Sequence, residues 1–120
     1  MKMKTEYVTV LPVTGTVQVG VRIEPETINL KSKGTFTAFI TLPTGYAMNN
    51  IDLNSLVCES AHAISGHATG EGSNMVIAKF DRQDLSGIYP GDAVTFTVTG
   101  RITTNGDSTD FQGSDFVRVI

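Results

Sequence analysis

The chain has 120 residues, a formal net charge of -3, 40% hydrophobic residues and a single cysteine. This length fits one ordinary domain whose apolar core needs no metal or disulfide staple, and one cysteine permits no intrachain disulfide. The acidic balance argues against a nucleic-acid partner, because the phosphate backbone is bound by a clustered basic face. The chain shows no signal peptide and no apolar run long enough to cross a bilayer, so we expect no membrane insertion.

The N-terminal part predicts two strands. The valine-rich residues 8–11 indicate the first. Apolar and polar residues then alternate over residues 17–23, which is typical of a half-buried strand. We expect residues 1–22 to form an extra strand or the end of a preceding linker, packed on a β-sandwich domain of residues 23–120.

The middle of the chain keeps the period of two. A turn at residues 31–34 precedes a strand whose polar face is mostly threonine, with Phe39 as an exception that could contact a neighbouring domain. The opposite face of that strand is apolar: Phe36, Ala38, Ile40 and Leu42. Further on, we expect two short capped turns, one opened by Asn50 or Asp52 and one at residues 81–85.

Asn105-Gly106 predicts the turn of a hairpin between the last two strands, because both central positions of a type I′ turn need positive φ. The strand before this turn has the clearest alternation of the chain, with Val94, Phe96 and Val98 set against threonines. A two-residue loop would place Arg101 opposite Asp110 as an exposed cross-strand ion pair worth roughly 0.2–1 kcal/mol.

The same register turns Asp115 inward against Phe96, which costs desolvation of a carboxylate. We therefore expect a β-bulge near Gly113 that rotates Asp115 outward.

Short strands at this spacing, with threonine on the wet face, predict an all-β, antiparallel, two-sheet β-sandwich of immunoglobulin-like type with about seven strands. A small closed barrel is the alternative. Tryptophan is absent and there is only one cysteine, so the prediction concerns architecture and not antibody-domain chemistry.

No catalytic site emerges from the sequence. The chain has no G-x-S-x-G elbow, no H-E-x-x-H pair and no phosphate-binding glycine loop. Cys58, His62 and His67 carry zinc-type ligands, but their spacing is irregular and a fourth ligand is not obvious. Cys58 more often fills a core position in such a pattern, and the histidines lie in a stretch typical of a loop. We expect no enzyme and no cofactor, with metal binding as an alternative.

Carbohydrate binding is a further alternative. A glycan platform is usually built from exposed aromatic rings, and Tyr46 and Tyr89 lie at comparable turns, beside Gly45 and Pro90. Together with Phe39, these two tyrosines form the candidate ligand surface.

Five segments give the chain a resemblance to a family of extracellular β-sandwich modules of archaeal and bacterial cell-surface and secreted proteins. They are residues 24–34 (EPETINLKSKG), 79–82 (KFDR), 90–92 (PGD), 97–100 (TVTG) and 117–120 (VRVI). The first segment is the most specific. Such modules often carry an acidic loop before the KFDR strand that could hold calcium, whereas residues 66–74 here contain one carboxylate.

The resemblance implies an extracellular or cell-surface location and transfers no catalytic residue. The expected function is that of a non-catalytic structural or interaction module, monomeric, whose partners are other domains of a larger surface protein or a glycan of the envelope.

Overall fold

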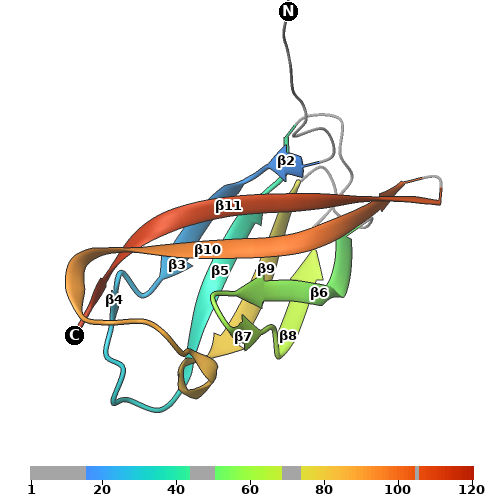
Figure 1. The fold of residues 1–120 in the computed structure, drawn as a ribbon. Helices are drawn as coiled ribbons and strands as arrows, with labels where there is room; N and C mark the ends of the chain where they lie inside the picture. The colour runs from blue at the N-terminus through green and yellow to red at the C-terminus, as the bar shows by residue number, and fades with distance from the viewer. Residues whose placement is uncertain (1–15, 44–50, 69–73, 105) are drawn as a thin grey trace, which may run out of the picture.

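The structure is a computed structural model that describes residues 16–43, 51–68, 74–104 and 106–120. The strand expected at residues 8–11 lies outside this part. The described residues form ten strands and one short 3₁₀-helix (Figure 1). The elements are β2 (Thr16–Gln18), β3 (Gly20–Glu24), β4 (Thr27–Ile28), β5 (Thr35–Thr41), β6 (Ile51–Cys58), β7 (Ala61–His62), β8 (Ser65–Ala68), β9 (Met75–Asp81), η3 (Arg82–Asp84), β10 (Gly91–Thr104) and β11 (Asp107–Val119).

These strands build two sheets that pack face to face, so the predicted all-β sandwich is confirmed. One sheet has the order β2-β11-β10-β6-β7, with β4 also paired to β11, and the other has the order β3-β5-β9-β8. Figure 1 shows the long hairpin of β10 and β11 crossing the strands of the four-stranded sheet. Pairing is mostly antiparallel, but β2 and β4 each pair with β11 in parallel. No helix of the described part is long and apolar enough to cross a membrane.

The predicted number of about seven strands is too low. The alternation over residues 17–23 is divided between two sheets, because the chain leaves β11 at Val19 and continues as β3 beside β5. β3 spans positions 22 and 23, where the sequence suggested that the domain begins. The segment after Asp52, expected as a helical turn, is part of strand β6.

The core lies between the sheets and consists of apolar side chains. Among the described residues, no polar or charged side chain is buried. The apolar face predicted for β5 is confirmed, since Phe36, Ala38, Ile40 and Leu42 are all at most 1% exposed. Phe36 stacks on Phe80 of β9 and meets the edge of Phe96 from the opposite sheet, with ring centroids 5.3 and 5.8 Å apart.

Two turn predictions are confirmed, the hairpin between β10 and β11 and the capped turn after β9. Residues of β10 and β11 pair in the register of a two-residue loop, with Arg101 opposite Asp110 and Val94 opposite Val117. At the second capped turn, the carboxylate of Asp81 accepts a hydrogen bond from the Gln83 N–H at 2.9 Å and caps η3.

The prediction of a bulge near Gly113 is wrong. The register runs without a shift from Val94 to Thr104, and Asp115 stays opposite Phe96. Its carboxylate accepts the Ile23 N–H of β3 and the N–H of its own neighbour Phe116, both at 2.8 Å. The carboxylate thereby supplies acceptors to strand edges of both sheets, which offsets the desolvation that the bulge was expected to avoid.

Replacing Asp115 with alanine is expected to lower the free energy of unfolding by about 1–3 kcal/mol, because the part-buried Ile23 N–H loses its acceptor. Asp115→Asn, which keeps one acceptor oxygen, should fall between this variant and the wild type. Urea denaturation measures the effect, and Asp110→Ala, which removes a 77% exposed carboxylate, is the control. Equal stability of Asp115→Ala and the control would contradict the role assigned to Asp115.

Candidate functional site

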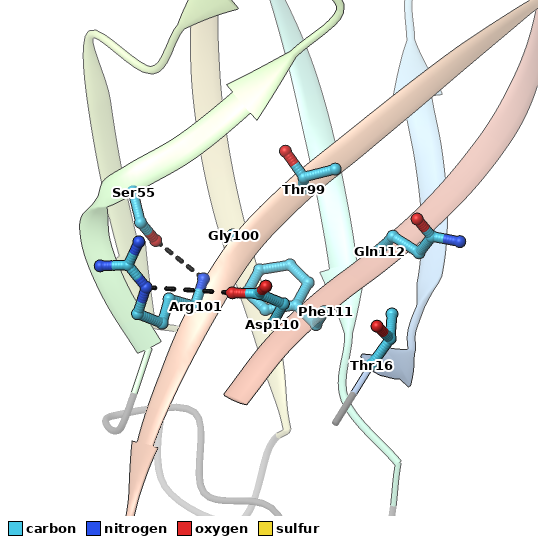
Figure 2. A pocket seen from close by; sticks show the side chains of 8 residues that line it. All are labelled: Thr16, Ser55, Thr99, Gly100, Arg101, Asp110, Phe111 and Gln112. Atoms are coloured by element: carbon cyan, nitrogen blue, oxygen red, sulfur yellow. Dashed lines mark hydrogen bonds and ion pairs between the residues drawn. The ribbon is translucent and has the colours of Figure 1, made fainter. Parts of the chain in front are cut away.

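A hollow of about 310 Å³ lies on the outer face of the six-stranded sheet, where β6 moves away from β10 (Figure 2). We call it the outer hollow. Its lining residues come from β2, β6, β10 and β11: Thr16, Ser55, Thr99, Gly100, Arg101, Asp110, Phe111 and Gln112.

An irregularity of β6 opens the outer hollow. Val57 pairs with Thr99 and Asp52 pairs with Arg101, so residues 53–56 of β6 stand against Gly100 alone. Two hydrogen bonds of the Ser55 hydroxyl hold this bulge. It donates to the Asp52 carbonyl at 2.6 Å and accepts the Arg101 N–H at 2.8 Å. The Asp52 carboxylate accepts the Asn54 N–H at 3.0 Å. Extra residues in one strand of a pair often re-aim side chains near functional sites.

Apart from Gly100 and Phe111, the residues around the outer hollow are polar, and their charges balance. The Arg101 Nε and an Asp110 oxygen lie 3.9 Å apart, and both side chains are more than half exposed. Thr99, Thr16 and Gln112 add hydroxyl and amide groups that both donate and accept. With one guanidinium and one carboxylate, the outer hollow suits a neutral polar ligand better than an anion or a cation.

A second hollow, of about 490 Å³, lies beside β11, between β3 and the place where β4 pairs with β11. We call it the edge hollow. It is lined by Arg22, Ile23, Glu24, Glu26, Thr27, Asp92, Asp115, Phe116 and Arg118. Its wall includes Phe116, a residue that is 69% exposed although it lies on a strand. The predicted hairpin register already places Phe116 opposite Thr95 on the wet face, so the sequence contained a signal for this residue.

The structure describes two of the three residues of the expected ligand surface, Phe39 and Tyr89. Tyr89 is 76% exposed in the loop before β10. Phe39 is half-buried on the outer face of the four-stranded sheet, where the Arg22 guanidinium lies 4.2 Å from its ring centroid. Tyr46 lies outside the described residues, so its pairing with Tyr89 stays a prediction.

The structure does not bring the three candidate zinc ligands together. Cys58 is buried in the core, and its pairing with Ala61 points it inward. His62 pairs with the neighbouring Val57 and is exposed on the other side of the same strands. His67 is exposed on the four-stranded sheet. In the described part of the chain, no three His, Cys, Asp or Glu residues are grouped so that they could hold a metal ion.

Burial, and secondarily the negative charge of Glu59, raises the pKa of the Cys58 thiol from 9.0 to about 12. Between pH 9 and 12 the Cys58 thiol stays protonated in the folded chain and is ionised in the unfolded chain. Its contribution to the free energy of unfolding is therefore fully present below pH 9 and is lost as the pH rises through this range. We expect the wild type to lose up to about 1.4 kcal/mol per pH unit more than Cys58→Ala in this range.

Urea denaturation of both proteins at pH 8 to 11 checks this prediction. Lysines and tyrosines titrate in both proteins, so their effect cancels when the two free energies of unfolding are subtracted. Parallel pH dependences of the two proteins would contradict it.

Comparisons with known protein families, with curated proteins and with solved structures found no match for this chain. The functional interpretation therefore rests on the residues of the chain itself and on their arrangement in the fold.

Proposed function

We propose that the chain is a non-catalytic module of a larger cell-surface or secreted protein, with a structural or interaction role. The observation that carries the proposal is that four of the five segments resembling extracellular modules, all except residues 97–100, contact one another at one end of the sandwich. This end is formed by the β3–β4 region, the end of β9 and the C-terminal end of β11.

Specific backbone contacts join these segments. Ile28 and Gly91 both have Val119 as a register partner. The Leu30 N–H donates to the Ile120 carbonyl at 3.0 Å, and the Arg82 N–H donates to the Gly34 carbonyl at 3.0 Å. Four of the five segments are thus joined by backbone contacts at one end of the sandwich, which is stronger support than scattered strand residues would be.

The distribution of side chains also suits such a module. All buried residues of the described part are apolar. A core of this kind stabilises a rigid scaffold and leaves its outer faces available for contacts with neighbouring domains.

Antibodies raised against the folded chain test the location. We expect them to label intact cells of the source organism, and removal of exposed proteins by external protease should abolish the signal. Labelling that appears only after lysis would contradict the proposal.

Carbohydrate binding is the second candidate function, and the outer hollow favours it. Hydroxyl-rich neutral ligands need donors and acceptors in close array, which Arg101, Asp110 and Gln112 supply on one sheet face. A hollow of about 310 Å³ falls at the lower end of the size range of small-molecule sites.

Co-sedimentation with insoluble polysaccharides tests this candidate. Retention should be lost in Gln112→Ala and Asp110→Asn and kept in His67→Ala, which changes an exposed residue on the other sheet. If Tyr89→Ala abolishes retention instead, the ligand surface lies at the tyrosine and not in the outer hollow. Absence of retention on every polysaccharide would contradict glycan binding.

A further inference from the structure

We propose that the edge hollow binds an arginine side chain, carried by a basic segment of a partner protein, over the ring of Phe116. This inference deepens the proposed interaction role and rests on it. It is drawn from a comparison of two aromatic rings. Phe39 has an arginine over it and a carboxylate beside that arginine, whereas Phe116 lies in a hollow with carboxylates.

Phe116 is an exception on its strand face. The other outward side chains of the hairpin, over residues 95–103 and 108–118, are threonine, serine, glutamine, aspartate or arginine. Exposed aromatic rings next to polar groups are enriched at protein interfaces, because one ring buries a large area at a low cost in side-chain entropy. The position therefore favours a contact outside the domain.

The complete arrangement lies on the four-stranded sheet. There the Arg22 guanidinium stands 4.2 Å from the centroid of the Phe39 ring and 3.3 Å from a carboxylate oxygen of Glu24. A cation over an aromatic face is held by the ring quadrupole, and the neighbouring carboxylate neutralises it. Within the described residues, Phe39 is the ring that has a cation over it.

Phe116 has the ring and the carboxylates of this arrangement, but no cation of the described residues lies over its ring. Glu26 and Asp92 line the same hollow, and both are exposed. In all, four carboxylates and the two guanidinium groups of Arg22 and Arg118 line the edge hollow, so its formal charge is -2. The Arg22 guanidinium is already engaged with Phe39 and Glu24.

Charge complementarity therefore selects a cationic occupant. A guanidinium fits better than an ammonium group, because its plane stacks on a ring while its donors reach carboxylates at the side. The volume of about 490 Å³ admits one long side chain with part of its backbone. An arginine-bearing segment of a protein partner meets each of these requirements.

A titration of the ¹⁵N-labelled full chain, followed by NMR, tests the proposal. The probe is an acetylated Gly-Arg-Gly-Arg-Gly amide, and its control is the same peptide with citrulline in place of arginine, which is neutral and nearly isosteric. We expect saturable shifts at the amides of Phe116, Glu26 and Asp92, and about fivefold weaker binding of the citrulline peptide.

Two variants make the test specific. Phe116→Thr should weaken arginine-peptide binding about fivefold and remain folded, because threonine suits an exposed strand position. Gln112→Ala, in the outer hollow, should bind like the wild type. Equal binding of both peptides, shifts confined to other surfaces, or no shifts at millimolar peptide would each overturn the proposal.

Cellopentaose serves as a neutral oligosaccharide probe in the same experiment. Shifts at Phe116 with this sugar and none with the peptide would overturn the arginine assignment in favour of a glycan. The antibody labelling described above is independent of this titration. If the antibodies label intact cells but the peptide does not bind, only the arginine assignment is contradicted. If labelling appears only after lysis, the proposed surface module itself is contradicted.

Discussion

Replacing Phe36 with alanine is expected to lower the free energy of unfolding by about 3–5 kcal/mol, which is a large part of the stability of an ordinary domain. The ring is 1% exposed and contacts two other rings. Phe80 lies beside it in the four-stranded sheet, at an interplanar angle of 17°, while Phe96 meets it from the six-stranded sheet at 79°.

The cost has two sources. Removing the ring leaves a cavity that the surrounding strands cannot fill without shifting, and it removes two aromatic contacts, one of them between the sheets. Urea denaturation followed by circular dichroism measures the effect. Phe116→Ala is the matched control, because the same change at a 69% exposed ring should alter stability by about 0.5 kcal/mol or less. A similar loss in both variants would contradict the assignment of Phe36 to the core.

Among the glycines of the described residues, Gly113→Ala is expected to be the most damaging substitution, with a loss of about 3 kcal/mol or more. A Cβ at this position would lie 2.3 Å from the Val19 carbonyl oxygen and 2.7 Å from a methyl group of Val21. Val19 is held against β11 by its N–H, which donates to the Gln112 carbonyl at 2.9 Å. Since the obstacle is backbone, the added methyl group would displace the segment where the chain passes from one sheet to the other.

Gly20→Ala is the control for this prediction. A Cβ at Gly20 would meet the Thr41 Cβ at 3.6 Å, an ordinary contact. This variant should equal the wild type or gain up to about 1 kcal/mol through the reduced freedom of its unfolded chain. Thermal and urea unfolding of both variants decide the matter, and a Gly113→Ala protein as stable as Gly20→Ala would refute the close crossing.

The two hollows differ in the chemical groups that line them and therefore suit different ligands. The outer hollow offers balanced donors and acceptors from Arg101, Asp110 and Gln112, whereas the edge hollow offers an exposed ring and an excess of carboxylates. Gln112→Ala and Phe116→Thr therefore serve as controls for each other in the glycan and arginine experiments.

Sequence alone determined the features that depend on neighbouring residues. The period of two assigned the core face of β5, because successive side chains of a strand point to opposite faces. Asn105-Gly106 set the register of β10 and β11, since few dipeptides accept the φ values of a tight hairpin turn. The cap at Asp81 was likewise predictable, because a short side-chain acceptor reaches an N–H two residues away.

Only the tertiary structure decided which strands pair and where polar groups find partners. The alternation over residues 17–23 is the same in either sheet, so nothing local marks Val19 as the point of exchange. Asp115 stays inward because a distant N–H, that of Ile23, reaches it, and the bulge of β6 depends on its contact with Arg101. The edge hollow combines residues from β3, β4, β10 and β11 that approach one another only when the sandwich closes, because strand pairing is a long-range choice that local propensity does not encode.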